Sequence, residues 1–263
     1  MPNTALWCLR LSVALQCFAA ARIAWVAGSA VNGWLFMRAG LPEGVGSVTD
    51  QIAAIILLLV SASALFRPER ILFLLGAAWM LAIALATFFN PGTTSDSLAL
   101  CSHAVRIAAP LCLAIALPNH QAKLFGTITP SPTALWILLV GTAATFTAHG
   151  VEALQHYGRF VDLLIGSGQL LGLTLSQSSA ESILTGIGLH DLLLVILLFS
   201  RRWRGIAGWM AIWGFATALS RMTTMGGDSW HQTAVRVANG GAPLTIFLAW
   251  SQLRPSTSQS RRP

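Results

Sequence analysis

Residues 203–244 decide the fold, because much of this stretch occurs twice in the chain: WRGIAGWMAIWGFATALSRMTTMGGDSWHQTAVRVANGGAPL. Three of its motifs recur 130 residues earlier: Trp209-Met210 as Trp79-Met80, Thr223-Thr224 as Thr93-Thr94, and Ala234-Val235-Arg236 as Ala104-Val105-Arg106. Pro243-Leu244 recurs 133 residues earlier as Pro110-Leu111, and Thr133-Ala134-Leu135-Trp136 recurs 129 residues earlier as Thr4-Ala5-Leu6-Trp7. Matches in one order at nearly constant spacing predict two tandem copies of one unit.

The composition indicates an integral membrane protein. Of 263 residues, 55% are hydrophobic and only 10% are charged, whereas soluble domains carry about 25% charged residues. The net charge of +7 does not indicate a nucleic-acid partner, because the basic residues lie in short loops between apolar runs. The lipid bilayer is therefore the expected partner.

A spanning helix needs about 20 mostly apolar residues, and the chain offers eight such candidates. They are residues 5–28, 51–66, 71–90, 98–117, 133–156, 182–200, 205–221 and 232–251. The second is short and is allowed to begin before Asp50. The predicted fold class is all-α, a polytopic bundle of eight transmembrane helices in two parallel four-helix repeats. The expected units are 1–120, a linker at 121–132, 133–253, and a disordered basic tail at 254–263.

The distribution of Lys and Arg predicts the orientation. One side carries nine basic residues: Arg67, Arg70, Lys123, Arg201, Arg202, Arg204, Arg254, Arg261 and Arg262. The other side's loops carry Arg38, Arg159 and Arg221. The positive-inside rule then places both termini in the cytoplasm and the chain in the inner (plasma) membrane. Each copy has an even number of spans, so a pseudo-two-fold axis along the membrane normal is expected.

The long loops follow the first helix of each copy, at 37–50 and 157–181. Within the second loop, Val161 to Ile165 are predicted to form a short helix along the membrane surface.

Ionisable residues inside the spans mark the candidate site. Arg22, Arg106 and Arg236 are the cations, and Glu152 and Asp191 are the carboxylates. Charged groups in hydrocarbon cost roughly 3 kcal/mol or more each, so these residues are expected to face the bundle interior and to pair. Five histidines lie near them in sequence or depth: His103, His149, His156, His190 and His231.

Helical spacing of about 100° per residue gathers these residues on single faces. The sets are Arg22, Trp25, Ser29 and Asn32; His103, Arg106 and Pro110; Thr145, His149, Glu152 and His156; and Arg236, Asn239 and Pro243. They fall on the first and last helices of each copy, toward the non-cytoplasmic half. We therefore expect a polar cavity that opens to that side.

The last candidate helix contains Asn239-Gly240-Gly241-Ala242-Pro243, which is expected to break or kink it. A broken helix at membrane depth is tolerated where it lines a cavity or is buried in protein. Two interpretations remain: a ligand site, or close packing of small residues against a neighbouring helix.

The set His149, Glu152 and His156 resembles an array of metal ligands on one helix face. A two-metal site needs more carboxylates than the chain offers, so no metal is predicted. A Glu152–Arg236 ion pair with neighbouring histidines is favoured, and proton transfer or quinol binding through the same groups is the alternative. Because His190 and Asp191 are adjacent, at most one of them points fully into the cavity, and Asp191 is favoured.

The repeat unit resembles the DoxX-like membrane proteins, which are four-helix units. The resemblance rests on an arginine-then-glycine first helix, Arg22 to Gly33 with His149-Gly150 in the second copy, and on short basic turns at Arg67–Arg70 and Arg201–Arg204. The family often has a carboxylate in its second helix, which Asp191 matches, whereas Ile52 to Phe66 holds none. The resemblance implies association with quinone-linked redox systems, membrane-protein assembly or cargo handling, and it supports the fold more than the function.

The functional prediction is a membrane protein with a buried polar cavity, an accessory subunit that interacts with a quinone or lipid and with a membrane or redox partner. The predicted ligand-binding residues are Arg22, Arg106, His149, Glu152, His156, Asp191, Arg236 and Asn239. No catalytic residue is assigned, and quinone is the cofactor considered. The alternatives are a quinone-linked oxidoreductase and a small-solute transporter.

Overall fold

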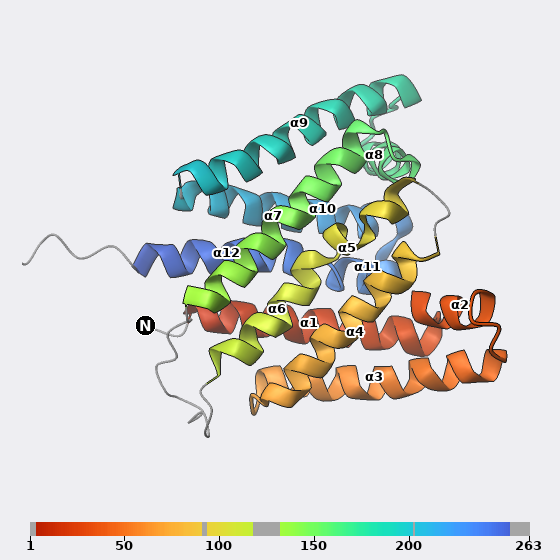
Figure 1. The fold of residues 1–263 in the computed structure, drawn as a ribbon. Coiled ribbons are helices and arrows are strands. Elements are labelled where there is room, and N and C mark those ends of the chain that lie inside the picture. The colour runs from red at the N-terminus through yellow and green to blue at the C-terminus, as the bar shows by residue number, and fades with distance from the viewer. Residues whose placement is uncertain (1–3, 91–93, 118–131, 202, 253–263) are drawn as a thin grey trace, which may run out of the picture.

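A computed structural model describes residues 4–90, 94–117, 132–201 and 203–252. The first half comprises α1 (Thr4–Val26), α2 (Ala30–Met37), α3 (Glu43–Leu65), α4 (Arg70–Phe88), the 3₁₀ helix η1 (Thr94–Leu98), α5 (Ala99–Ser102) and α6 (Ala104–Ala116). The second half comprises α7 (Pro132–Leu154), α8 (Gly158–Leu170), α9 (Gln177–Arg201), α10 (Arg204–Met225), the 3₁₀ helix η2 (Gly227–Ser229), α11 (Trp230–Ala234) and α12 (Ala238–Gln252). The all-α prediction is confirmed (Figure 1).

Six segments of the described chain are long and apolar enough to cross a membrane. They are Thr4–Met37, Glu43–Leu65, Arg70–Phe88, Asp96–Ala116, Pro132–Leu154 and Gln177–Ser200. The other two expected spans, 205–221 and 232–251, coincide with α10 and with α11–α12, but these helices are not among the six.

The predicted loops are the part that differs most. The prediction of a loop at 37–50 is wrong for its second part, because α3 already begins at Glu43. The short helix α2, just before this loop, was not predicted. In the loop at 157–181, the helix expected at Val161–Ile165 lies inside the longer α8. The linker at 121–132 lies outside the described residues except for Pro132, which begins α7. The tail at 254–263 also lies outside them.

The turn from α1 to α2 shows how the sequence fixes a local bend. Gly28 has a φ of +79°, a conformation that glycine adopts without strain. Ser29 then caps α2, since its Oγ accepts hydrogen bonds from the N–H groups of Val31 and Asn32. The turn from α7 to α8 also passes through a left-handed residue, His156, with a φ of +51°.

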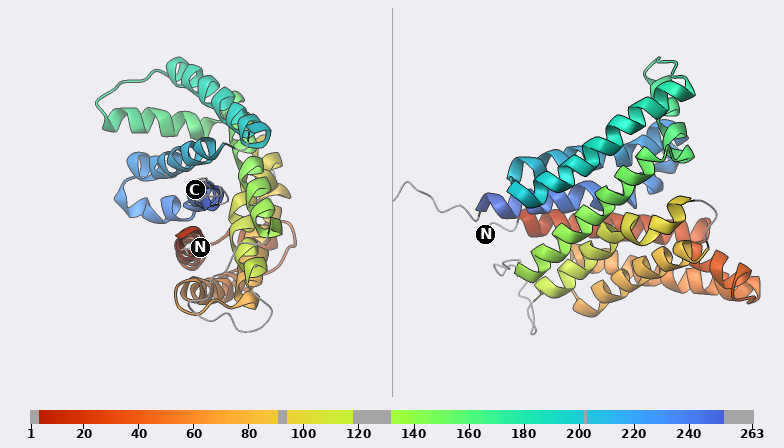
Figure 2. Two further views of the ribbon diagram at one scale, coloured as in Figure 1. Left: turned by 90° about the vertical axis from the view of Figure 1, so that its left-hand side faces the viewer. Right: turned by 45° about the horizontal axis from the view of Figure 1, so that its top comes forward.

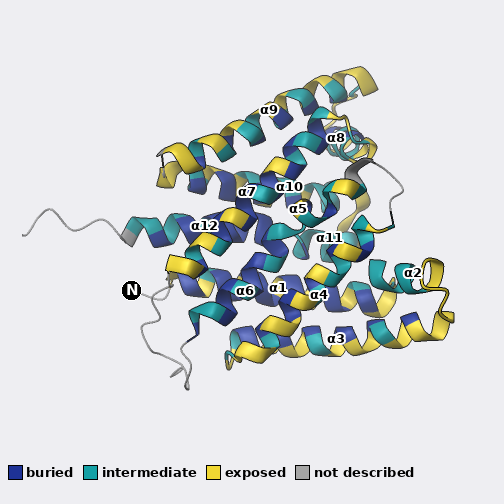
Figure 3. Cartoon of the chain, in the orientation of Figure 1, coloured by how far each residue is buried: buried dark blue, intermediate teal, exposed yellow. Residues whose placement is uncertain are grey.

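The two halves pack on each other through their first and last helices, an arrangement we call exchanged packing. Within each half the first long helix packs on the second, α1 on α3 and α7 on α9. The last helix packs on the preceding long helix, α6 on α4 and α12 on α10. Between the halves, α6 packs on α7 and α12 packs on α1 (Figures 1 and 2). The core therefore centres on α1, α6, α7 and α12 and extends to α3, α4, α9 and α10; Figure 3 colours the buried residues dark blue.

Small residues allow the close approach at both junctions between the halves. A Cβ added at Gly141 of α7 would lie 2.5 Å from the Cβ of Ala108 in α6. A Cβ added at Gly241 of α12 would overlap the hydroxyl of Ser12 in α1. Contacts of this kind are typical of helices that pack in membranes.

The outer faces of α3, α4 and α9 are apolar and exposed. Ile55, Ile71 and Ile196 are 53%, 72% and 63% exposed. An exposed apolar band of this extent is unusual for a soluble protein and is expected where lipid surrounds the bundle.

The short elements gather at one end of the bundle. α2, α5, α8 and α11 lie at the right-hand end in Figure 1, whereas the α3–α4 and α9–α10 turns lie at the left-hand end with the start of α1 and the end of α12. Arg67 and Arg204 therefore belong to the same end.

Candidate functional site

A cavity of about 530 Å³ lies in the second half, between α7, α8, α9, α10 and the start of α12. Most of its wall is apolar and includes Phe146, Leu163, Leu164, Leu184, Ile187 and Leu219. Its charged or strongly polar lining residues are His149, Asp191, Arg221, Arg236 and Asn239. We call it the second-half cavity. Its volume lies within the range of roughly 300–1,000 Å³ found for small-molecule sites.

The helix α8 covers this cavity because it is fastened to the end of α10. A Cβ added at Gly166 would lie 2.5 Å from the methyl group of Thr224, so only glycine permits this approach. The hydroxyl of Ser167 lies 2.8 Å from that of Thr223, and the Thr224 hydroxyl donates to the carbonyl of Leu163 at 3.2 Å. These contacts fix the apolar residues of α8 opposite α10.

On α7, His149 and Glu152 form a hydrogen-bonded pair. Nδ1 of His149 lies 3.0 Å from Oε2 of Glu152, whose side chain is 6% exposed. The expected Glu152–Arg236 ion pair is wrong, because within the described residues Glu152 pairs with His149. The reason is local: residues three apart on one helix meet without help from another element.

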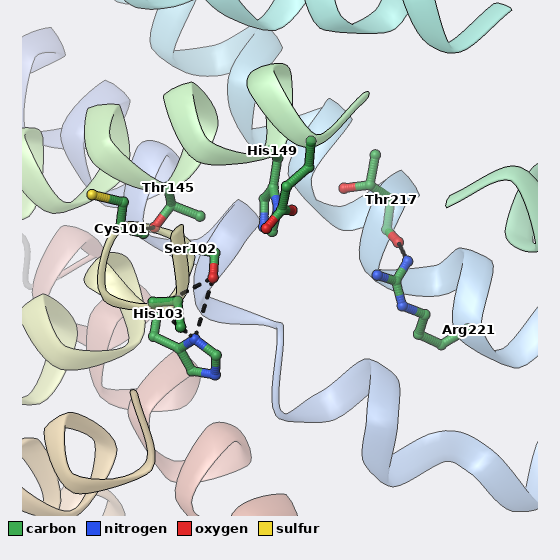
Figure 4. Close-up of polar contacts among 9 residues, drawn as sticks. Cys101, Ser102, His103, Thr145, His149, Thr217 and Arg221 are labelled. Carbon is green, nitrogen blue, oxygen red and sulfur yellow. Dashed lines mark hydrogen bonds and ion pairs between the residues drawn. The ribbon is translucent and has the colours of Figure 1, made fainter. Parts of the chain in front are cut away.

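Three arginines lie close enough to interact through their charges, and we call Arg106, Arg221 and Arg236 the arginine cluster. Their guanidinium charges repel one another across the site, while Glu152 attracts Arg106 and Arg221. One amino group of Arg221 donates to the Thr217 carbonyl and the Ser220 hydroxyl, at 3.3 and 3.0 Å (Figure 4).

The other two arginines lie near the starts of the last helices of each half. Arg236 donates to the main-chain carbonyl and the side chain of Gln232, at 2.7 and 3.0 Å. Arg106 is 7% exposed, and its Nε has no hydrogen-bond partner within the described residues.

The helix of the first half that ends in α6 is broken at His103, and α7 compensates for the break. Oγ1 of Thr145 accepts from the N–H of Val105 at 3.0 Å and donates to the carbonyl of Cys101 at 3.2 Å (Figure 4). The amide of Gln16 in α1 donates to the carbonyl of Arg106 at 2.8 Å. The bonds of Thr145 satisfy an N–H and a carbonyl that an unbroken helix would pair with each other. The bond from Gln16 satisfies a carbonyl that Pro110, four residues on, cannot pair because proline has no N–H.

The second break lies upstream of its predicted position. It falls at residues 235–237, between α11 and α12, and α12 runs through Asn239 to Pro243 without interruption. Bonds of the 3₁₀ type, such as Arg236 N–H to Thr233 and Val237 N–H to Ala234, turn the chain before the glycines are reached.

The Asn239–Pro243 stretch packs closely against a neighbouring helix and also reaches the second-half cavity. Asn239 lines the second-half cavity. A Cβ at Gly240 would lie 2.5 Å from the ring of Phe215, so this glycine provides close packing against α10.

Asp191 lies at another side of the second-half cavity. Nε1 of Trp213 donates to its Oδ1 at 2.8 Å, and Nδ1 of His190 lies 3.2 Å from the same oxygen. His190 is not part of the cavity lining, and its Nε2 accepts from Nε1 of Trp209. Of this adjacent pair, therefore, Asp191 is the residue that reaches the cavity.

The structure thus gathers most of the predicted residues and leaves two apart. His149, Asp191, Arg236 and Asn239 line the second-half cavity, with Glu152 and Arg106 beside them. Arg22 is exposed near the end of α1, in the other half. His156 is exposed at the α7–α8 turn, where its ring bonds to Thr185 at 2.9 Å.

Two charged side chains of the interior were not predicted from the sequence. Arg221 was assigned to a loop, but α10 continues to Met225 and places it in the cavity wall. Asp50 was also assigned to a loop, although it is 1% exposed in α3. Helical spacing of Gly46, Asp50, Ala53 and Leu57 was the signal that could have revealed it.

Within the described residues, no group of three or more His, Cys, Asp or Glu side chains is arranged to hold a metal ion. A scan of protein-family models and searches of curated proteins and of solved structures found no match to this chain. The resemblance to DoxX-like proteins stays a prediction that rests on the residues quoted for it.

Proposed function

We propose that the protein is an eight-span membrane protein built from two parallel copies of a four-span unit. Helices at all eight expected positions support this proposal, as does the identical order of long, short and 3₁₀ elements in both halves. The exchanged packing supports it too, because a two-fold operation that maps α1 onto α7 also maps the α1–α12 junction onto the α7–α6 junction.

The orientation follows from the same proposal. The protein lies in the inner (plasma) membrane, and the end with Arg67 and Arg204 faces the cytoplasm. Helices α2 and α8 face the opposite side of the membrane. A cysteine introduced at Glu69 should be shielded from a membrane-impermeant maleimide in intact cells, and one at Asp162 should react. The reverse pattern would refute this orientation.

The second-half cavity is the proposed binding site for an amphipathic membrane ligand, a lipid or a quinone. Its apolar wall suits a hydrocarbon tail, and its arginines, Asn239 and His149 suit a polar headgroup. Two residues of its rim, Leu171 and Leu219, are 74% and 50% exposed, so the cavity opens toward the surroundings of the bundle. This combination of apolar wall, charged end and open rim is the observation that carries the proposal.

Extraction in a mild non-ionic detergent followed by native mass spectrometry tests this function. The wild-type protein should retain about one amphipathic molecule per chain. Ile187→Trp fills the cavity from α9 and should abolish retention, whereas Ile196→Trp, on an exposed position of the same helix, should not. Equal retention by both variants, or none by the wild type even after lipid and quinone are added, would refute the proposal.

One feature, the His149–Glu152 pair beside the cavity, makes a quinone a second candidate ligand. Glu152 holds His149 by a hydrogen bond, an arrangement that suits the proton transfer that quinol chemistry requires. On this hypothesis the purified protein oxidises a quinol analogue with a soluble acceptor, and Glu152→Gln lowers that rate. An undiminished rate in Glu152→Gln would exclude the pair from the reaction.

A further inference from the structure

The polar end of the second-half cavity holds more positive than negative charge. The arginine cluster contributes three guanidinium groups, and Glu152 is a carboxylate that interacts with two of them, Arg106 and Arg221. Arg236 interacts with the other two arginines and with Arg159. Asp191 does not balance the excess, because its partners are His190, Trp213 and, at longer range, His149.

The arginines are also incompletely paired. Within the described residues, none of the three lies within 4.0 Å of a carboxylate oxygen, and their bonds go to carbonyls, a hydroxyl and an amide. Guanidinium groups present five donors in a fork that matches carboxylate and phosphate oxygens, so several donors remain for a ligand.

Uncompensated charge at this depth is costly. Each cation loses hydration on burial, and cations that repel one another raise that cost further. A bound anion removes the repulsion and supplies the acceptors, whereas a neutral headgroup supplies acceptors only. The site is therefore more complementary to an anion than to a neutral polar group.

We propose that the second-half cavity selects amphipathic ligands whose headgroup is an anionic oxyacid, a carboxylate or a phosphate. The inference rests on the proposed function, because it assumes that this cavity holds a membrane ligand. Arg221 and Arg236 contact the headgroup from the cavity wall, and Arg106 adds its field from behind them. The hydrocarbon tail lies along α8 and leaves the cavity past Leu171 and Leu219.

Binding of matched probes to the full-length protein in non-ionic detergent at pH 8.5 tests the selection. The probes are oleate, an oleoyl lysophosphatidate, oleyl alcohol and inorganic phosphate, all measured by native mass spectrometry. Oleate and the lysophosphatidate should bind about tenfold or more tightly than oleyl alcohol, which is the effect of one strong charge-assisted interaction.

The probes also separate the two proposals. Equal binding of oleate and oleyl alcohol would overturn the anion selection and leave the amphipathic site intact. Binding of neither would overturn the proposed function itself. Inorganic phosphate bound as tightly as the lysophosphatidate would show a site for a free anion and would overturn the lipid assignment.

Variants with opposite expected signs protect the test against misfolding. Arg221→Gln should weaken oleate binding about tenfold or more, while oleyl alcohol binding changes less than about threefold. Glu152→Gln removes the opposing carboxylate and should tighten oleate binding severalfold, which a folding defect cannot do. Arg22→Gln, an exposed arginine of the other half, is the matched control and should change neither. Parallel weakening in Arg221→Gln and Glu152→Gln would refute the charge argument.

Discussion

The two halves of the molecule share one arrangement of helices but fill it differently. In the first half α2 has 8 residues and lies close against α3, where a Cβ at Gly46 would overlap the side chain of Asn32. In the second half α8 has 13 residues and stands over a cavity of about 530 Å³. The comparison teaches that the two halves differ in the short helix that follows their first long helix. The same arrangement of long helices occurs with a short helix packed against it and with one that covers a cavity.

A buried carboxylate ties the first half closed. Asp50 accepts a hydrogen bond from the Ser29 hydroxyl at 2.5 Å through Oδ1 and from the Ser29 N–H at 2.8 Å through Oδ2. These bonds join the start of α2 to α3. At the turn between α7 and α8, by contrast, the bond runs from the exposed His156 ring to Thr185.

The largest effect is expected from breaking this tie. Asp50→Ala leaves the half-buried Ser29 N–H and hydroxyl without their acceptors and opens a gap where the buried carboxylate was, so it should lower the free energy of unfolding by about 2–4 kcal/mol. Unfolding in detergent measures it, with Asp162→Asn, an exposed position of α8, as the control. Retention of ligand in the second half should survive in the folded fraction. A loss below about 0.5 kcal/mol would show that the tie does not stabilise the first half.

A smaller effect is expected at the broken helix of the first half. Thr145→Val removes the hydroxyl that serves both Val105 and Cys101, and should cost about 1–3 kcal/mol in the free energy of unfolding. Thr142, on the same helix, is fully buried and its hydroxyl has no partner within the described residues. Thr142→Val should therefore be neutral or stabilising. If both variants behaved alike in the same unfolding assay, the break would not depend on α7.

The smallest expected effect is a difference in unfolding free energy between variants of two tryptophans, one from each half. Trp213 in α10 donates to Asp191, whereas the buried Nε1 of Trp79 in α4 has no partner within the described residues. Both lose similar packing on replacement by Phe, so Trp213→Phe should cost about 1–2 kcal/mol more than Trp79→Phe. Equal costs in parallel unfolding curves would show that the hydrogen bond from Trp213 to Asp191 does not stabilise the second half.

The sequence predicted the long helices well because their signal is strong. Uninterrupted apolar runs leave few alternatives once water is excluded, and the expected ranges agree with the helices at nearly all their ends. It failed where polar residues extend a helix beyond its apolar run. Asp50 lies in the first part of α3 and Arg221 in the last part of α10, so both were taken for loop residues.

The sequence predicted which residues belong to the candidate site better than it predicted which of them pair with each other. Helical spacing correctly placed His149 and Glu152 on one face, and adjacency correctly separated His190 from Asp191. Which cation meets which carboxylate depends on how helices from both halves are placed, and one chain's spacing holds no information on that. His156 was misplaced because it lies beyond the end of α7 and has a left-handed backbone, which turns it off the expected face. Arg22 lies within α1, on a face that is exposed together with Trp25.

The exchanged packing has a consequence for how the protein is made. In the other half, the helix that packs on α1 is α12, which is the last described helix to be synthesised. The Cys8 thiol donates to the carbonyl of Gly241 at 3.6 Å, 233 residues further along the chain. At roughly 5–20 residues per second, ribosomal synthesis separates the two by about 10–50 seconds. During that interval Ser12 and the face around it meet lipid or the insertion machinery instead of α12. The packing of α1 is thus completed only after α12 has been made, and a ribosome that stops after α6 releases a bundle in which α1 packs on α3 and α6 but lacks α12.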